Sequence, residues 1–440
     1  MQRVSTANRT MKVGAIAAAT AAVAFSLSAC SPTDGEAAGG ETVITCASCQ
    51  EGEDLFLQYN YDAAQRFNEK YEGQYRIETL NNQNAGSGAE RLSYYQRLAL
   101  ADDLPDVFLL DKQETITLSE SAELLDFNAA LDADPEWKDS FYPDALATLN
   151  VDGVQLGLPE VRDVVGIYAN TTILEDAGVG EFPQTWDELE AACDAVSASG
   201  KTCLAMDGNW VTLLMWANLI GTQDGGTEFL ESAISGDDWA TEDIVVDATE
   251  TLRSWHEKGY VNVDSLSGDY ANAATVFQTG EAAMIANGPW MLGDIKSDAS
   301  APGLADATTY NVAPGWAEGE GGVVSITGGS WVSGSQDEAK QEAAIAFFKF
   351  LSSGDEPYEQ TVATGSYPAV QTELTAEQAD SLDPLIAGAV EAASVVPFHY
   401  PNATANAAST FGPNWLNLWP AYVQGELDTT TFLERLATDG

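Results

Sequence analysis

Apolar and polar residues follow two periods along this chain, and the pattern predicts alternating strands and helices. Three short apolar runs are typical of buried strands: Thr42 to Cys46, Tyr75 to Leu80 and Asp106 to Leu110. The segments between them carry apolar residues at helical spacing, for example Ala64, Phe67 and Tyr71. Strands that alternate with helices at this distance predict a parallel sheet with crossover helices.

The same alternation returns later in the chain. Gly166 to Ala169 is typical of a strand, and Thr185 with Glu188 forms a capping box that starts a helix ending near Gly200. Two further helices are predicted from apolar stripes, which consist of Ala248, Leu252 and Trp255, and of Ala344, Phe347, Phe348 and Leu351. The chain therefore has enough α/β structure for two domains of ordinary size.

The N-terminus is predicted to be an export signal rather than part of the fold. Basic residues precede an apolar run from Val13 to Leu27, which is shorter than a membrane span of about 20 residues. The run ends in Leu27-Ser28-Ala29-Cys30, which resembles the lipobox of bacterial lipoproteins. The resemblance implies that residues 1–29 are removed and that Cys30 carries lipid outside the cytoplasm, on the extracytoplasmic face of the cell membrane. The alternative is an ordinary signal peptide that is cut near Ala29.

The segment after Cys30 is small, polar and glycine-bearing, and residues 30–42 are expected to form a flexible tether. No later segment is long enough and apolar enough to span a membrane. The chain has 68 acidic and 18 basic residues and a formal net charge of −50. This charge argues against nucleic acid or an anionic lipid surface as a partner, and it favours a neutral ligand.

Four cysteines remain after Cys30, an even number in an oxidising compartment. Three pairings are possible, and local closure favours Cys46 with Cys49 and Cys193 with Cys203. A redox-active dithiol at Cys46 and Cys49 is the alternative, but that chemistry requires a helix N-terminus and this motif follows a strand. One such motif is poor grounds for a zinc site, and only His256 and His399 could supply imidazole, so no metal or cofactor is expected.

Seven short stretches together resemble the solute-binding proteins of carbohydrate ATP-binding-cassette importers, the group that includes maltose-binding protein. They occur in order over nearly the whole mature chain: Leu104–Phe108, Gly153–Pro159 with Gly166–Asn170, Phe182–Leu189, Phe277–Met284, Asn287–Trp290, Gly328–Trp331 and Thr364–Pro368. The resemblance implies a periplasmic-binding-protein type II fold, in which two α/β lobes are joined by a hinge and close on a ligand between them.

The resemblance also implies where the lobes divide and what they do. Lobe 1 is expected to comprise residues 43–159 and 313–365, and lobe 2 residues 160–312 and 366–440, with crossings near residues 159–163, 310–313 and 366–368. Such a protein is a monomer without catalytic activity. It binds a sugar or oligosaccharide and delivers it to the membrane permease subunits of the importer.

Polar ligand-binding candidates come from the rule that ligands lie beyond the carboxyl ends of strands in α/β sheets. The rule selects Asp111, Ser48 and the group Glu160, Arg162 and Asp163. Carboxylates and arginine suit the hydroxyl rim of a sugar. Arg162 could instead pair with Glu160 or Asp163 and hold the hinge, and Asp111 could pair with Lys112 in the same way.

Aromatic candidates would cover the C–H faces of a sugar. The resemblance assigns Trp290 to stacking on the ring. Trp331 follows Gly329 and Ser330, where backbone can approach a ligand closely, and Trp210 follows Asn209. Each of these tryptophans could instead pack in a core.

Two other classes of protein remain alternatives. A secreted glycoside hydrolase also uses two carboxylates and aromatic subsites, although the seven stretches leave no segment for a catalytic barrel. A glycan-binding surface lipoprotein without a role in transport is the other alternative; a surface adhesin or structural lipoprotein would have no affinity for a small ligand and would not close.

Overall fold

The computed structural model describes residues 40–52, 54–80, 89–232, 234, 238–372, 374–407 and 410–438. The export signal, Cys30 and most of the expected tether lie outside these residues. Residues 41–440 form one unit with separate clusters of buried side chains. We call the clusters around Phe67 and Tyr95 the first core, and the cluster around Trp216 the second core.

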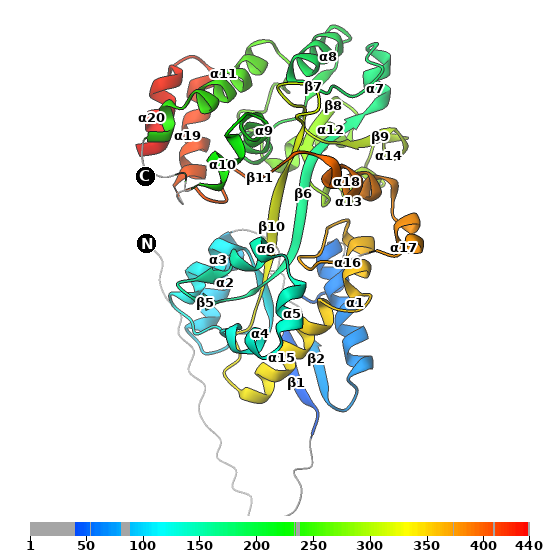
Figure 1. Ribbon diagram of the computed structural model, residues 1–440, viewed down its shortest axis with the longest axis vertical. Coiled ribbons are helices and arrows are strands. Elements are labelled where there is room, and N and C mark those ends of the chain that lie inside the picture. Colours follow the sequence, from blue (N-terminus) through cyan, green and yellow to red (C-terminus); the bar gives the residue numbers. More distant parts are fainter. Residues whose placement is uncertain are drawn as a thin grey trace, which may run out of the picture. The chain divides into compact units, whose positions relative to one another are not determined.

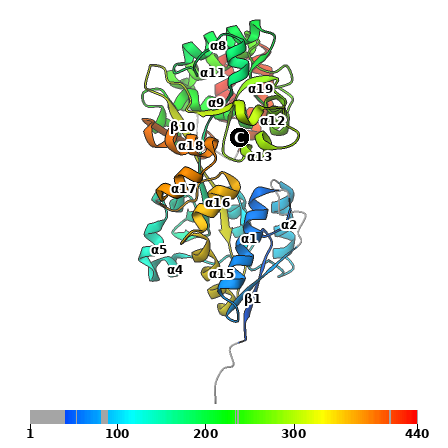
Figure 2. The same ribbon diagram turned by 90° about the vertical axis from the view of Figure 1, so that its right-hand side faces the viewer.

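The elements around the first core come from the N-terminal part of the chain and from a later segment, residues 338–364 (Figure 1). They are β1 (Thr42–Cys46), α1 (Leu55–Lys70), β2 (Tyr75–Thr79), α2 (Ala89–Ala99), β3 (Phe108–Leu110), α3 (Lys112–Ser119), α4 (Asn128–Ala133), α5 (Pro135–Ser140), α6 (Pro143–Ala147), β4 (Asn150–Val151), β5 (Val154–Gln155), α15 (Glu338–Leu351) and α16 (Glu356–Thr364). Figure 2 shows α1 and α16 side by side, and the Tyr59 hydroxyl donates to the Glu356 carbonyl oxygen between them.

The elements around the second core follow in the middle and at the end of the chain. They are α7 (Thr171–Asp176), α8 (Trp186–Ala198), β7 (Thr202–Leu204), α9 (Trp210–Gly221), α10 (Gly226–Glu231), the 3-10 helix η1 (Asp238–Thr241), α11 (Asp243–Glu257), α12 (Tyr270–Gln278), β8 (Ala282–Asn287), α13 (Met291–Lys296), α14 (Leu304–Ala307), β9 (Thr308–Asn311), α18 (Pro384–Val395), β11 (Phe398–Pro401), α19 (Phe411–Val423) and α20 (Thr429–Thr438). The short helix α17 (Ala376–Ser381) buries none of its residues.

Two long strands, β6 (Leu158–Asn170) and β10 (Gly322–Val332), pass from one core to the other. They are antiparallel neighbours from Asp163 opposite Ile326 to Leu158 opposite Trp331. Val323 packs in the second core and Trp331 in the first. The chain therefore returns to the first core along β10, later than the crossing expected near residues 310–313.

The sheet pairing confirms the mixed α/β fold. Strands β1 and β2 are parallel, as are β7 and β8. The crossing strands are antiparallel additions, because β10 pairs with β3 on one side and with β6 on the other. The predicted capping box starts α8, where Thr185 Oγ1 accepts from the Glu188 amide and Glu188 accepts in return.

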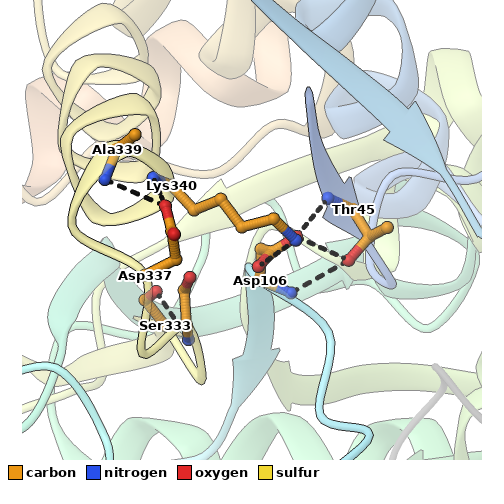
Figure 3. Close-up of polar contacts among 7 residues, drawn as sticks. Thr45, Asp106, Ser333, Asp337, Ala339 and Lys340 are labelled. Atoms are coloured by element: carbon orange, nitrogen blue, oxygen red, sulfur yellow. Dashed lines mark hydrogen bonds and ion pairs between the residues drawn. The ribbon is translucent and has the colours of Figure 1, made fainter. Parts of the chain in front are cut away.

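A buried carboxylate joins three elements of the first core (Figure 3). Asp106 precedes β3 and accepts hydrogen bonds from the amide and the hydroxyl of Thr45 in β1, at 2.9 and 3.1 Å. Lys340 in α15 lies 3.0 Å from the same carboxylate, and Asp337 caps the start of that helix. This contact fixes β1, β3 and α15 to one another, and so fixes the ends of the strands that carry the candidate site.

Candidate functional site

Asp163 lies in β6 where three chain segments meet. Its carboxylate accepts hydrogen bonds from the Ser366 hydroxyl and from the Tyr367 amide, both at 2.9 Å. The residue is 2% exposed, and this burial raises the pKa of Asp163 to about 7. Both carboxylate oxygens thus accept hydrogen bonds from residues 366–367, the segment in which the third crossing is expected. Asp163 therefore holds β6 to that segment.

Glu160 lies three residues earlier in the same strand and is also buried. Asn60 of α1 donates to Glu160 Oε1 at 3.3 Å. Burial raises the pKa of Glu160 to about 8, and the Asp163 carboxylate adds to the rise. Gly329 in β10 has a φ of +64°, and a Cβ there would lie 2.4 Å from Glu160 Oε2, so only glycine leaves room for this carboxylate.

Arg162 contacts neither neighbouring carboxylate of its own strand. Its Nε lies 2.9 Å from Asp144, and its guanidinium lies 4.8 Å from the centre of the Tyr142 ring. Both partners belong to the first-core segment that contains α6, so Arg162 braces β6 against that segment. The arginine also lines a cavity of about 280 Å³ together with Tyr367 and His399.

Asp111 follows β3 and is the most accessible of the acidic candidates, with 65% of its side chain exposed. Arg91 lies 2.8 Å from the Asp111 carboxylate, while Arg91 Nε donates to Glu114 at 3.0 Å. Asp111 thus pairs with Arg91 and not with Lys112, the alternative partner considered from the sequence. Asp111 therefore presents an exposed oxygen beside an arginine that two carboxylates already neutralise.

Three candidates have side chains buried in the first core. The Ser48 hydroxyl accepts from the Leu109 amide at 2.9 Å. Ser330 is 1% exposed, in a strand that is paired on both sides. Trp331 packs on Phe347 and Phe348, with ring centres 5.7 and 5.6 Å away. These side chains support the site from within rather than facing a ligand.

Trp290 and Trp210 come together on the second core. Their ring centres lie 6.4 Å apart with the planes inclined by 49°, and both rings are partly exposed. Asp207 fixes the start of α9 by accepting from the amides of Asn209 and Val211, and this places Trp210 and Asn209 at the N-terminus of the helix. Burial raises the pKa of Asp207, while the backbone hydrogen bonds lower it.

Both expected cysteine pairs are joined by disulfide bonds. Cys46 and Cys49 have Cα atoms 5.6 Å apart and enclose Ser48 at the end of β1. Cys193 and Cys203 link α8 to β7, with Cα atoms 5.1 Å apart. The first pair fixes the loop after β1, and the second fixes the strand that leads to Trp210.

Three residues near the candidate site had no signal in the sequence. Asn60 lies in the middle of a helix and Arg91 in an ordinary polar stretch, so neither stands out locally. Tyr270 starts α12 and has its hydroxyl 3.3 Å from Asn287 Nδ2. Only the packing of distant segments brings these side chains to the site.

Within the described ranges, no group of three or more His, Cys, Asp or Glu side chains could hold a metal ion. Among the same residues, no helix combines the length and apolar character needed to cross a bilayer. The arrangement suits binding of a polar, uncharged molecule, with aromatic faces on one core and hydrogen-bonding carboxylates at the crossing strands.

Comparison with known proteins agrees with the fold. A family model described as bacterial extracellular solute-binding protein matches residues 62–421. A chitin oligosaccharide binding protein of known structure has a TM-score of 0.72 and 21% identity, and the match covers 91% of this chain and 98% of that one. The cyclic alpha-maltosyl-1,6-maltose binding protein of Arthrobacter globiformis gives 0.70 and 20%, with 90% and 97% covered.

Curated relatives match over a shorter range. The sn-glycerol-3-phosphate-binding periplasmic protein UgpB of Agrobacterium fabrum is 25% identical over 51% of this chain and 55% of its own length. The xylose/arabinose-binding protein XacG of Haloferax volcanii is 26% identical over 42% of this chain and 39% of its own length. The chain thus spans about half the length of the curated relatives it matches, or less.

Proposed function

Because the chain belongs to the bacterial extracellular solute-binding proteins, a family of binding proteins rather than enzymes, we propose that it captures a neutral sugar or oligosaccharide for an ATP-binding-cassette importer. In this proposal the ligand binds between the two lobes, one built around the first core and the other around the second core. The observation that carries the proposal is the pair of partly exposed tryptophans, Trp210 and Trp290, on a chain whose crossing strand β6 holds two buried carboxylates. The loaded protein then delivers the sugar to the permease subunits.

The charges near the crossing strands favour an uncharged ligand over a phosphorylated one. Arg91 and Arg162 are each held by carboxylates, at 2.8 and 2.9 Å, so neither offers an unneutralised positive charge to a phosphate. Asp111 and Glu160 accept hydrogen bonds, and sugar hydroxyls donate them. Glycerol phosphate, the ligand in the name of one relative, would meet repulsion from the exposed Asp111 carboxylate.

Within this proposal Trp290 and Trp210 stack on the sugar, Asp111 and Asn209 bind hydroxyl groups, and Glu160 with Gly329 lines the floor. Asp163 and Arg162 hold the crossing segments in place. Ser48, Ser330 and Trp331 are left out of the contact set because their side chains are buried in the first core.

A thermal-shift screen tests the proposal, since a ligand that binds only the native state raises the melting temperature by mass action. The mature protein is heated with a panel of neutral mono- and oligosaccharides and, for comparison, with sn-glycerol 3-phosphate. We expect a shift with at least one neutral sugar and none with the phosphate. A shift with the phosphate alone would overturn the choice of ligand class, and no shift with any sugar would count against sugar binding.

We also propose that Cys30 carries a lipid anchor and that the segment between Cys30 and β1 tethers the protein to the outer face of the membrane. A solved relative from Streptomyces coelicolor, described as a probable secreted solute-binding lipoprotein, supports this arrangement, with a TM-score of 0.69 and 19% identity over 90% of this chain and 98% of that one. One acyl chain anchors weakly and several anchor stably. The Cys30→Ser variant should appear in the culture medium or in the soluble fraction, whereas the unaltered protein should sediment with membranes.

A further inference from the structure

The backbone of Asp111 is fixed at both of its polar groups. Its amide donates to Glu114 Oε2 at 2.9 Å, and its carbonyl oxygen accepts from the amide and the hydroxyl of Thr115, at 2.8 and 3.0 Å. The preceding residue, Leu110, pairs with Ser330 of β10. The main chain from which the Asp111 carboxylate extends therefore has a defined position between the end of β3 and the start of α3.

Arg91 of α2 contacts the carboxylate itself. Arg91 Nη2 lies 2.8 Å from Asp111 Oδ2, and it also forms an ion pair with Glu114 Oε2. Arg91 Nε donates to the same Glu114 oxygen at 3.0 Å. Because a guanidinium is planar and rigid, its two contacts with Glu114 set the direction from which it meets Asp111.

The three side chains of this group differ in their exposure. The side chains of Arg91 and Glu114 are 10% and 12% exposed, whereas that of Asp111 is 65% exposed. Arg91 and Glu114 thus form a buried base, and Asp111 is the member that a ligand can reach. A carboxylate that is already ordered loses less conformational entropy when a ligand binds it.

From these contacts we infer that Arg91 is a positioning residue for ligand binding: held by Glu114, it fixes the Asp111 carboxylate in the orientation that accepts hydrogen bonds from a sugar. The inference rests on the proposed function, in which Asp111 binds hydroxyl groups. Arg91 acts through Asp111 and does not itself contact the ligand. Lysine would keep the charge but lacks the planar fork that fixes the direction of the contact.

The contact can be tested without any ligand. In protein labelled with nitrogen-15, the Nε–H resonance of Arg91 is assigned by its loss in Arg91→Lys. Asp111→Ala should move this resonance, because it removes one of the two carboxylates that the guanidinium contacts. Asp144→Ala is the matched control, since Asp144 is a similarly exposed carboxylate that pairs with Arg162. It should move the Arg162 resonance and leave that of Arg91 in place.

A double-mutant cycle then tests the effect on binding. Arg91→Met should weaken binding of the sugar found in the screen by about three- to tenfold, within the range for coupled neighbours. In the Asp111→Ala background the same substitution should change the affinity by less than about twofold. An equal loss in both backgrounds would mean that Arg91 acts on the sugar directly or through the whole fold, and would overturn the inference. Unaltered affinity in Asp111→Ala, or an unmoved Arg91 resonance in that variant, would overturn it as well.

Arg91→Met leaves the Glu114 carboxylate without its buried partner, so the cycle is repeated with Glu114→Gln in all four proteins. Glutamine can still accept from Arg91 but carries no charge. The repeated cycle should again show a loss that disappears in the Asp111→Ala background, and it decides the matter if Arg91→Met alone does not fold. If the unaltered protein binds no sugar, the proposed function fails, and the resonance still decides whether Arg91 holds Asp111.

Discussion

The Asp163→Asn substitution should change the free energy of unfolding more favourably at pH 8 than at pH 5. Burial raises the pKa of Asp163 from 3.8 to about 7. Each pKa unit corresponds to about 1.4 kcal/mol, so the charged carboxylate costs the native state up to about 4 kcal/mol. Asparagine has nearly the same shape and carries no charge. It can still accept one of the two hydrogen bonds from Ser366 and Tyr367.

The sign follows from proton binding. Between pH 4 and pH 7 the native state keeps the proton on Asp163, while the unfolded state has released it. The native state of the unaltered protein therefore loses stability as the pH rises through this window, and Asp163→Asn does not. From pH 5 to pH 8, the free energy of unfolding of the variant should gain about 2–3 kcal/mol relative to that of the unaltered protein. Glu160 titrates in both proteins, so its contribution largely cancels.

Urea unfolding followed by circular dichroism at pH 5 and pH 8 gives the four free energies. Asp144→Asn is the control, because that carboxylate is 60% exposed and its pairing with Arg162 is screened by solvent. The control variant should change the free energy of unfolding by less than about 0.5 kcal/mol at both pH values. If Asp163→Asn and the unaltered protein have parallel pH dependences, the argument from burial is wrong.

Three further predictions concern binding and stability. Trp290→Ala should weaken sugar binding by more than about tenfold in calorimetric titration while the melting temperature stays nearly constant, because the ring is partly exposed; unaltered affinity would remove Trp290 from the site. Asp106→Ala should lower the free energy of unfolding by about 3 kcal/mol, since it leaves the Thr45 amide and Lys340 without their shared partner; a loss below about 1 kcal/mol in urea unfolding would contradict this. Replacing Cys193 and Cys203 by serine should cost about 2–3 kcal/mol, the range for a short closed loop, and reductant should destabilise the unaltered protein more than the variant, which keeps only the Cys46–Cys49 disulfide.

Local elements could be read from the sequence because their determinants lie within a few residues. The capping box of Thr185 and Glu188 is one example, and it starts α8 where it was expected. The apolar stripe through Phe347 and Phe348 is another, and it faces the first core. The two α/β groups themselves follow from the repeated spacing of such elements.

The direction of single side chains could not be read in this way. The strand-end rule correctly placed Ser48 beyond β1, but its hydroxyl turns inward to the Leu109 amide, 61 residues away in the chain. The sequence suggests Glu160 or Asp163 as an ion-pair partner of Arg162, whereas the partner in the structure is Asp144. Tyr270 has no local motif at all, and its contact with Asn287 depends on the packing of α12 against the end of β8.

The path of β10 has a consequence for the order in which the protein folds. Ser330 pairs with Leu110 on one side and with Pro159 on the other, so β10 fills a gap between segments made far earlier in synthesis. Until residues 322–332 arrive, β3 and the start of β6 lack their shared neighbour and leave backbone groups unpaired. Most of the second core, in contrast, is contributed by residues 164–313, which precede that strand. The first core must therefore wait for a late strand, and a truncated chain that ends before residue 322 should leave it incomplete.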